Sequence, residues 1–320
     1  MKKILFTAAV MLFGVMSGAC AGWMSKVADS VRVDHMSIPG SHDSATGCGT
    51  TCDSLAQTQE LDIASQFDAG IRAFDFRPSA EGNTLRIYHG LYATNVTFEE
   101  AIDVLVDKLE QEPDEFAIIV MRHEDTHETP EEKASWGPMM SELLNNYSHR
   151  ERLITFRPGL TAGDLRGKIL VLSRDKYGDK PVGGYIRDWS HEPDFASQDK
   201  AVIYGKGKVG LHVQDFYDTY NALDVKLESI KNVIDYSEKA DKGGKWVINH
   251  ASGYYSPSTV TADTYRINAS AINGEVARYL KEGKGPAGII MMDFAGADCS
   301  GDRVVDGKIL IDAIVERNFR

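Results

Sequence analysis

Short apolar runs alternate with helical patterns along most of the chain, and this alternation is the strongest constraint on its fold. Runs rich in Val, Ile, Leu and Phe predict strands. They lie at 33–38, 71–76, 85–88, 116–121, 168–173, 209–213, 245–249 and 288–292. Apolar residues at helical spacing predict helices at 56–68, 97–110, 130–147, 224–239, 268–281 and 306–317. Strands joined by helices pair in parallel, so the pattern predicts an α/β barrel rather than an antiparallel sandwich.

The alternation is irregular in two places. Too few residues separate the strands predicted at 71–76 and 85–88 for a crossover helix, and residues 178–207 show no helical period. No Pro/Ser-rich linker, internal repeat or low-complexity segment divides the chain, and 320 residues fit one large barrel. We therefore predict a single domain with an irregular (βα)8 TIM-type barrel.

The first 20 residues have the features of an export signal. Two lysines precede an apolar segment at 4–15, and the small residues Ser17-Gly18-Ala19 follow it. We predict a signal peptide at 1–20 and a folded domain at 21–320. Cys20 directly follows the small residues and resembles the acceptor of a bacterial lipoprotein signal. Two outcomes stay open: a membrane-anchored lipoprotein, or ordinary cleavage that leaves a secreted or periplasmic protein.

The other cysteines and the net charge limit what the chain can bind. Cys48 and Cys52 lie close together in a Gly/Thr-rich loop, so a short disulfide and reduced thiols both stay open, with Cys299 left over. No second cysteine pair or nearby histidine completes a zinc site. The formal charge of -12 argues against a nucleic-acid surface and against broad adhesion to anionic membranes. Any phosphate must therefore be bound locally.

Polar side chains cluster where the predicted strands end. Because the carboxyl ends of parallel barrel strands meet on one face, we expect these side chains to share one site. In chain order the candidates are His42, Asp43, Asp75, Arg77, His89, Arg122, Arg174, Asp215, Tyr217 and Asp293. His212 and His250, on late strands, are weaker candidates for lining the same pocket.

This set of residues favours cleavage of a phosphodiester by an internal hydroxyl. Two histidines with nearby carboxylates suit a general base and a general acid near neutral pH. An arginine suits a phosphate that gains charge in the transition state, because its guanidinium donates two hydrogen bonds. The alternative is a metal-dependent phosphodiesterase with Asp43, Asp75 and histidines as ligands. Arg77 argues against it, because it places positive charge where the cation would lie.

Three motifs together resemble a known family. They are Ser37-Ile38-Pro39-Gly40-Ser41-His42-Asp43-Ser44, Phe74-Asp75-Phe76-Arg77 and Tyr88-His89-Gly90. The chain closely resembles bacterial phosphatidylinositol-specific phospholipase C, of the PI-PLC X-domain family. The resemblance continues through Val213-Gln214-Asp215 to Met292-Asp293 and spans nearly the whole mature chain. It implies an irregular, incompletely closed barrel.

The resemblance also implies a role for each matched catalytic residue. His42 would be the general base that takes the proton of the inositol 2-hydroxyl, with Asp293 holding its other ring nitrogen. His89 would be the general acid that protonates the diacylglycerol oxygen, assisted by Asp43. Arg77 would contact the phosphate in place of the calcium ion of eukaryotic relatives.

Further matched residues would orient the phosphate and bind the head group. Asp75 would orient the phosphate centre, and Arg122, Arg174, Asp215 and Tyr217 would bind the inositol. Arg122 departs from the family pattern, because relatives commonly carry lysine there and arginine sets a different geometry. Tyr217 would stack on the apolar side of the sugar.

The implied reaction converts phosphatidylinositol into diacylglycerol and inositol 1,2-cyclic phosphate without a metal or other cofactor. The implied partner is phosphatidylinositol at a membrane interface, with glycosyl-phosphatidylinositol anchors as further candidate substrates. We expect a monomer that binds no nucleic acid. Two alternatives stay open: a metal-dependent glycerophosphodiester phosphodiesterase on the same barrel, and a non-catalytic inositol-binding relative.

Overall fold

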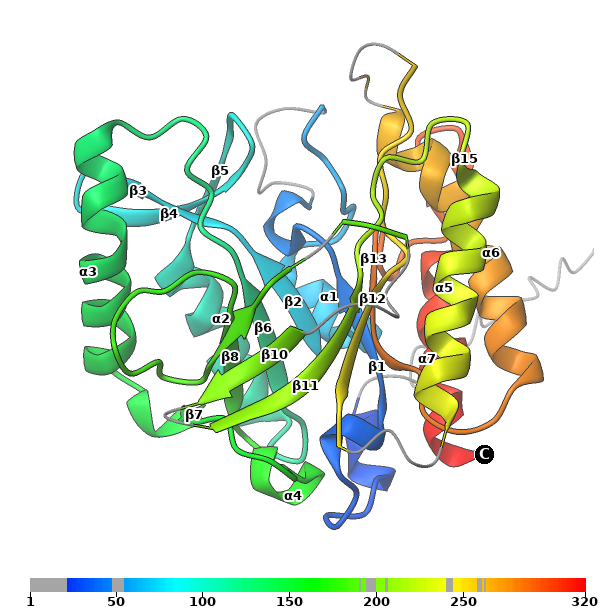
Figure 1. The fold of residues 1–320 in the computed structure, drawn as a ribbon, viewed down its shortest axis with the longest axis horizontal. Coiled ribbons are helices and arrows are strands. Elements are labelled where there is room, and N and C mark those ends of the chain that lie inside the picture. The colour runs from blue at the N-terminus through cyan, green and yellow to red at the C-terminus, as the bar shows by residue number, and fades with distance from the viewer. Residues whose placement is uncertain are drawn as a thin grey trace, which may run out of the picture.

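A ring of paired strands forms a barrel that the longer helices surround (Figure 1). The computed structural model describes residues 22–47, 55–189, 191–193, 200–204, 207–239, 244–257, 261 and 263–320. In these residues the ring contains β1 (Ser37–Ser41), β2 (Ala73–Phe76), β6 (Ala117–Met121), β8 (Ile169–Ser173), β9 (Gly184–Arg187), β10 (Lys200–Tyr204), β11 (Gly207–Gln214), β12 (Trp246–His250) and β13 (Gly288–Met292). β10 runs antiparallel to both of its neighbours, and the other eight strands run parallel. The predicted irregular α/β barrel is confirmed.

The barrel is irregular because neighbouring strands pair over different lengths; each such pairing is called a seam here. β1 and β13 pair along their whole lengths, from Ser37↔Gly288 to Ser41↔Met292. The β8–β9 seam, by contrast, consists of Leu172↔Gly184 and Ser173↔Tyr185. β6 also pairs with β8, which links the two sides of the sheet. β7 (Leu153–Ile154) is a short addition to β8.

Two predicted barrel strands differ from the structure. Residues 33–35 of the run at 33–38 form the 3-10 helix η2 (Val33–His35), so the strand β1 starts only at Ser37. The run at 85–88 belongs to β4 (Thr84–His89), the middle strand of a separate antiparallel sheet with β3 (Pro78–Glu81) and β5 (Tyr92–Thr97). Gly82, with a φ of 58°, makes the tight turn between β3 and β4. A short apolar run does not reveal its pairing partner, which is why sequence periodicity placed it in the barrel. The eighth parallel strand is instead β9, inside the region without a helical period.

The predicted helices are present with shifted ends. They are α1 (Ile63–Ala69), α2 (Phe98–Gln111), α3 (Pro130–Asn146), α5 (Leu223–Glu238), α6 (Thr264–Glu282) and α7 (Gly307–Glu316). The short helix α4 (Ala162–Leu165) is not among the predicted helices. Capping boxes fix the starts of α2 and α3, where Thr97 pairs with Glu100 and Thr129 with Glu132. Minor elements are η1 (Trp23–Lys26), η2 (Val33–His35), η3 (Ser44–Thr46), η4 (Arg150–Arg152), η5 (Arg317–Phe319), β14 (Cys299–Ser300) and β15 (Arg303–Val304).

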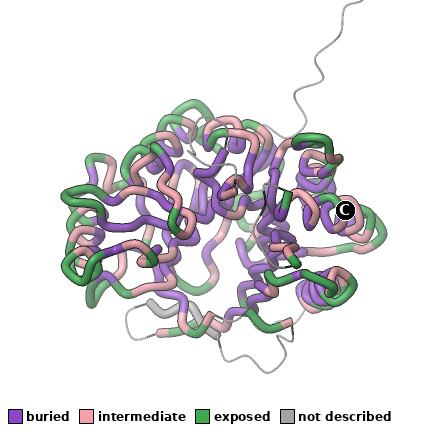
Figure 2. The backbone as a smooth tube through the Cα atoms, turned by 90° about the horizontal axis from the view of Figure 1, so that it is seen from above, coloured by how far each residue is buried: buried purple, intermediate pink, exposed green. Residues whose placement is uncertain are grey.

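The core fills the barrel and the space beneath its helices. Buried backbone is concentrated at the centre and exposed segments lie around it (Figure 2). β6, β8 and β13 are buried along their full lengths, as parallel strands covered on both faces must be. Gly40 permits close packing here, because a Cβ at this position would lie 2.3 Å from the sulfur of Met291.

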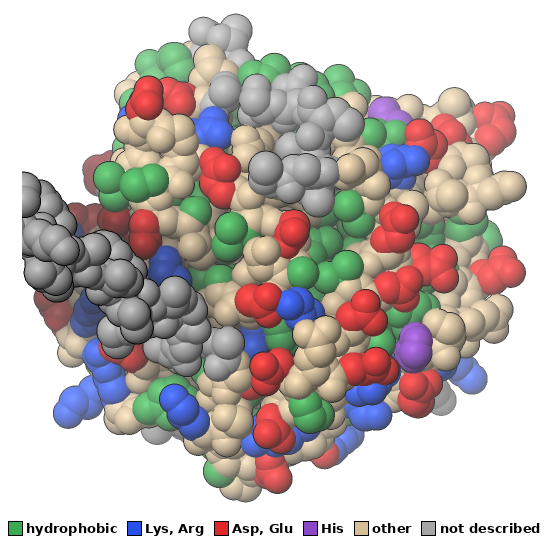
Figure 3. All heavy atoms as spheres, turned by 180° about the vertical axis from the view of Figure 1, so that it is seen from behind, with side chains coloured by type: hydrophobic (Ala, Val, Ile, Leu, Met, Phe, Trp, Pro, Cys, Tyr) green, Lys and Arg blue, Asp and Glu red, His purple; other side chains and the backbone are tan. Residues whose placement is uncertain are grey.

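Several predictions concern residues that the structure does not describe. The signal peptide at 1–20 with Cys20, and also Cys48 and Cys52, lie outside the described residues. Cys299 is exposed and forms no disulfide within the described residues. Within the described chain, no helix is long and apolar enough to cross a membrane. On the face shown in Figure 3, acidic and basic side chains are interspersed.

Candidate active site

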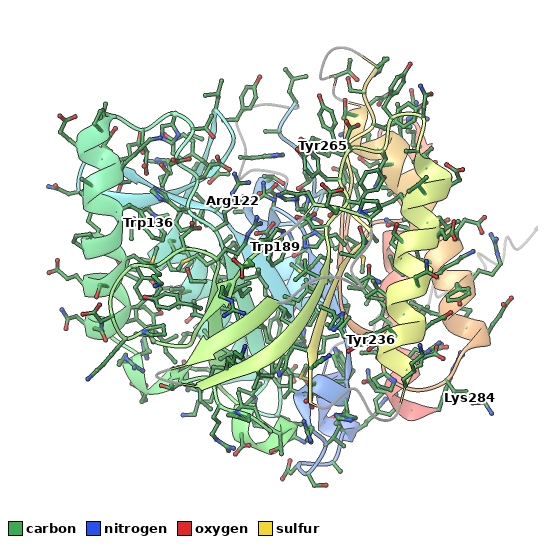
Figure 4. All side chains as sticks on the ribbon, viewed as in Figure 1. Arg122, Trp136, Trp189, Tyr236, Tyr265 and Lys284 are labelled. Carbon is green, nitrogen blue, oxygen red and sulfur yellow. The ribbon has the colours of Figure 1, made fainter. Side chains whose placement is uncertain are left out.

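The predicted site residues gather around one cavity at the carboxyl ends of the barrel strands. The cavity has a volume of about 340 Å³, and its lining includes His42, Arg77, His89, Arg122, Arg174, Asp215 and Tyr217. Asp43, Asp75 and Asp293 are buried against these residues. Figure 4 labels Arg122, Trp189 and Tyr265, which lie around this end of the barrel. All ten candidates are therefore brought together.

His42 directly follows β1 and is contacted through both ring nitrogens. Its Nδ1 lies 2.8 Å from Oδ1 of Asp293, so the proton of the neutral ring stays on Nδ1. Its Nε2 lies 2.7 Å from Nη2 of Arg77 and 3.2 Å from Oδ2 of Asp43. Burial alone lowers the pKa of His42, but Asp43 and Asp293 outweigh burial and raise it to about 9.

Two influences oppose each other at Nε2 of His42. The carboxylates favour a protonated nitrogen, whereas Arg77 can only donate and therefore needs the bare nitrogen. The 2.7 Å contact with Arg77 corresponds to the bare form, which is the form that a general base requires. At neutral pH a pKa of about 9 keeps the ring of His42 mostly protonated, so the contact with Arg77 belongs to its minor neutral form, and this is the form that can act as the base.

Arg77 and its carboxylates form the centre of the site. Nε of Arg77 lies 2.9 Å from Oδ1 of Asp43, and Nη2 donates to Oδ2 of Asp75 at 3.0 Å. Burial would raise the pKa of Asp75, but Arg77 and then His42 lower it to about 2. Asp43 has a φ of 43°, an uncommon conformation for a residue with a side chain. This conformation places its Oδ2 between the two histidines, 3.4 Å from Nε2 of His89.

This centre also offers a possible cation site. His42, Asp43 and Asp75 each present a ligand atom, and these atoms lie within 4.8 Å of one another. Arg77, however, pairs with both carboxylates, so its guanidinium competes directly with a cation for the same oxygens. The residue set therefore fits a resident arginine better than a resident metal.

His89 reaches the cavity from outside the barrel. It ends β4 of the separate antiparallel sheet, so its expected place at the end of a barrel strand is wrong, although its expected place in the site is right. Its Nδ1 lies 2.8 Å from the carbonyl oxygen of Ala56, and its Nε2 lies 3.2 Å from the hydroxyl of Tyr265. The rings of His42 and His89 are 6.3 Å apart, with Asp43 within reach of both.

The other half of the cavity is built around Asp215, at the end of β11. Its Oδ2 accepts a hydrogen bond of 2.7 Å from Nε1 of Trp189 and lies 3.1 Å from Nδ1 of His191. Its Oδ1 lies 3.5 Å from Nδ1 of His250. Burial opposes the charge of Asp215, but His250 and His191 are among the neighbours that hold its pKa well below the usual value. Asp215 is therefore a fixed negative charge.

Arg174 faces Asp215 across this half of the cavity. Its guanidinium carbon lies 4.0 Å above the ring of Trp189, and burial lowers the pKa of Arg174 to about 10. Arg122 is more open, with Nη1 3.8 Å from Oε2 of Glu124. Tyr217 is half exposed at the mouth, and its ring lies 4.9 Å from that of His191. Together they present two cations and an aromatic ring to a polar ligand.

Sequence reasoning missed Trp189, Tyr265 and also His191, a loop residue that lines the cavity and contacts Asp215. Trp189 lies in the region without a periodic pattern, and Tyr265 lies at the start of α6, where an aromatic residue carries no functional signal. Neither of the two weaker histidine candidates lines the cavity. His250 is buried behind it and contacts Asp215, whereas His212 stacks on Tyr236 at 4.1 Å. The sequence signal for His250 is its position at the end of an apolar run, since it is the last residue of β12.

Comparisons with known proteins give one consistent answer. No family model matches the chain. It is 28% identical over 286 residues to the 1-phosphatidylinositol phosphodiesterase of Staphylococcus aureus strain Newman, covering 86% of this chain and 88% of that protein. It is 29% identical over 285 residues to the Listeria monocytogenes protein of the same name, covering 85% of this chain and 80% of the relative.

A solved structure extends the likeness to the fold. A variant of the phosphatidylinositol-specific phospholipase C from Staphylococcus aureus superimposes with a TM-score of 0.74 at 25% identity. The superposition covers 92% of this chain and 96% of the solved chain. The resemblance expected from the His42, Arg77 and His89 motifs is confirmed over most of the length, and this chain is similar in sequence and fold to the bacterial phosphatidylinositol-specific phospholipases C.

Proposed function

We propose that this protein is a phosphatidylinositol-specific phospholipase C, a phosphatidylinositol diacylglycerol-lyase. It converts phosphatidylinositol into diacylglycerol and inositol 1,2-cyclic phosphate. The observation that carries the proposal is the pair of histidines, His42 and His89, whose rings lie 6.3 Å apart on either side of Asp43. Arg77 lies at the same centre and supplies the positive charge that a phosphate needs. Relatives that carry this activity in their names support it.

The first half of the reaction is proton removal by His42. A phosphate bound at Arg77 gives the guanidinium a new partner, which frees Nε2 of His42 for the inositol 2-hydroxyl. Nε2 takes the hydroxyl proton while Asp293 stabilises the positive charge that develops on the ring. The 2-oxygen then attacks phosphorus, and Arg77 stabilises the charge that develops on the phosphate oxygens.

The second half is departure of diacylglycerol. The bond from phosphorus to the glycerol oxygen breaks, and that oxygen takes the proton from Nε2 of protonated His89. Oδ2 of Asp43 lies 3.4 Å from this nitrogen, so the carboxylate stands beside the group that donates the proton. Each proton transfer is worth ~10²–10⁴-fold in rate. Arg77 takes the place of a cation, so we propose that the reaction needs no metal or other cofactor.

The second group of residues binds the head group. Arg174, Asp215, Tyr217 and Arg122 line the remaining part of the cavity, where cations and a fixed carboxylate suit a ring of hydroxyl groups. Glycosyl-phosphatidylinositol anchors carry the same phosphoinositol diester, so we propose them as further substrates. We also propose a monomer acting at a membrane interface.

Product identity tests the proposed function. Phosphatidylinositol and phosphatidylcholine are each incubated with the protein, and the water-soluble products are followed by ³¹P NMR. We expect inositol 1,2-cyclic phosphate from phosphatidylinositol and no product from phosphatidylcholine. Release of phosphocholine, or of an acyclic inositol phosphate with no cyclic precursor, would reject the proposal.

We further propose that residues 1–20 direct export and that the mature protein is secreted, periplasmic or anchored through a lipid on Cys20. Mass spectrometry of the mature N-terminus separates these routes. A lipid-modified Cys20 supports the anchored form, and an unmodified N-terminus near residue 21 supports the released form. A mature protein that retains residues 1–20 rejects the signal.

A further inference from the structure

The hydroxyl of Tyr265 contacts the nitrogen of His89 through which the proposed reaction passes. Oη lies 3.2 Å from Nε2, and the two rings are 5.5 Å apart. We propose that Tyr265 is a positioning residue that occupies Nε2 of His89 once its proton has left, and so favours release of the cyclic product over its hydrolysis. The inference rests on the proposed function. It concerns which product, cyclic or hydrolysed, leaves the same site.

The contact is held by the surrounding fold. Tyr265 lies in the first turn of α6, is 8% exposed, and lines the cavity beside His89. Burial, followed by the charges of Asp43 and Asp293, raises the pKa of Tyr265 far above its usual value. The hydroxyl therefore keeps its proton throughout the pH range of the reaction and remains a hydrogen-bond donor.

The tautomer of His89 decides the direction of this hydrogen bond. Nδ1 faces the carbonyl oxygen of Ala56 at 2.8 Å, and a carbonyl only accepts, so Nδ1 keeps its proton. Only Nε2 exchanges a proton with substrate. While Nε2 is protonated, the carboxylate of Asp43 lies beside it as a counter-charge, with Oδ2 3.4 Å away. Once it is bare, the carboxylate has nothing to donate, and the Tyr265 hydroxyl turns to donate to the lone pair.

This hydrogen bond bears on the fate of the cyclic product. Hydrolysis requires bare Nε2 of His89 to take a proton from a water molecule that attacks phosphorus. The bond from phosphorus to the inositol 2-oxygen then breaks, and His42 returns its proton to that oxygen. A lone pair already occupied by Tyr265 is less available to the water. The cyclic phosphate consequently leaves before it is hydrolysed.

The test compares Tyr265→Phe with the wild-type protein and with Tyr279→Phe. Tyr279 lies on the same helix, and its hydroxyl donates to Asp235, so the control removes the same atom outside the cavity. The kcat/KM for phosphatidylinositol cleavage and for hydrolysis of inositol 1,2-cyclic phosphate are both measured. We expect the ratio of hydrolysis to cleavage to rise about fivefold in Tyr265→Phe, the factor that corresponds to one neutral hydrogen bond. The control keeps the wild-type ratio.

An active Tyr265→Phe variant with an unchanged or lower ratio overturns the inference and leaves the proposed function intact. A wild-type protein that does not cleave phosphatidylinositol instead rejects the proposed function. ¹⁵N NMR of neutral His89 then examines the contact independently of activity. We expect the Nε2 resonance of Tyr265→Phe to move toward that of a free imidazole nitrogen, and an unmoved resonance overturns the hydrogen bond and the inference with it.

Discussion

Nδ1 of His42 lies 2.8 Å from Oδ1 of Asp293, although 251 residues separate them in the chain. Each residue directly follows a barrel strand, and these two strands, β1 and β13, are neighbours with Ser41 paired to Met292. The pairing of the first barrel strand with the last therefore builds the candidate general base. Oδ2 of Asp293 accepts from the backbone N–H of Gly253, which fixes the carboxylate in turn.

The first prediction concerns this pair. Asp293→Asn removes one of the carboxylates that raise the pKa of His42 to about 9, so that pKa should fall. The variant should also lose ~10²-fold or more in phosphatidylinositol cleavage, because the developing imidazolium loses its counter-charge. NMR titration of the His42 ring measures the pKa, and Asp235→Asn, at an exposed position, is the matched control. An unchanged titration would contradict the assignment.

The second prediction concerns Arg77. Its guanidinium reaches Asp43 through Nε, and Asp75 and His42 through Nη2, a planar spacing that the compact ammonium of lysine does not reproduce. Arg77→Lys should reduce kcat for phosphatidylinositol by ~10²-fold or more while the protein remains folded. The control is Arg278→Lys, on the exposed face of α6. Circular dichroism verifies folding, and a variant with wild-type kcat would show that Arg77 does not act on the phosphate.

The third prediction concerns Asp215, whose oxygens are held by Trp189, His191 and His250. Asp215→Asn removes the fixed charge but keeps the shape, so binding of the head group should weaken more than catalysis. We expect KM for phosphatidylinositol to rise with a smaller change in kcat. Steady-state kinetics on mixed micelles measure both constants. A fall in kcat alone would place Asp215 in the chemical step instead.

The fourth prediction concerns Lys226, which is fully buried on α5 and donates to the carbonyl oxygen of Phe216 at 2.6 Å. Burial, only partly offset by Asp215 and Asp293, lowers the pKa of Lys226 to about 7. Between this pH and the ordinary lysine value, the unfolded chain binds more protons than the folded one. Lys226 therefore makes stability rise with pH across that window and costs the fold most below pH 7.

Lys226→Met should thus stabilise the protein at pH 6 by a few kcal/mol, less the lost hydrogen bond, and by much less at pH 9. Urea unfolding at the two pH values measures the difference. Lys239→Met, at an exposed position at the end of the same helix, is the control. An equal effect of Lys226→Met at both pH values would contradict the lowered pKa.

The sequence was most informative where strands end in charged residues. Asp75, Arg122, Arg174, Asp215 and Asp293 could be placed in one site because parallel strands bring their carboxyl ends to one face. These placements needed no knowledge of the loops. They followed from the direction of the strands alone.

Contacts between distant segments could not be predicted in this way. His89 and Tyr265 are 176 residues apart and lie on a separate sheet and a helix, so no local pattern connects them. The strand at 85–88 has the same apolar character whether it joins the barrel or a hairpin. Its partners are chosen by the turn at Gly82 and by packing, not by its own composition.

The central claim is metal-independent cleavage by His42 and His89. The most direct measurement is diacylglycerol release from phosphatidylinositol in excess chelator, with wild-type protein, His42→Ala, His89→Ala and the double variant. The wild type should release diacylglycerol at the same rate with and without chelator, and each histidine variant should lose nearly all activity while remaining folded. Release only after calcium is added, or an active double variant, would contradict the account.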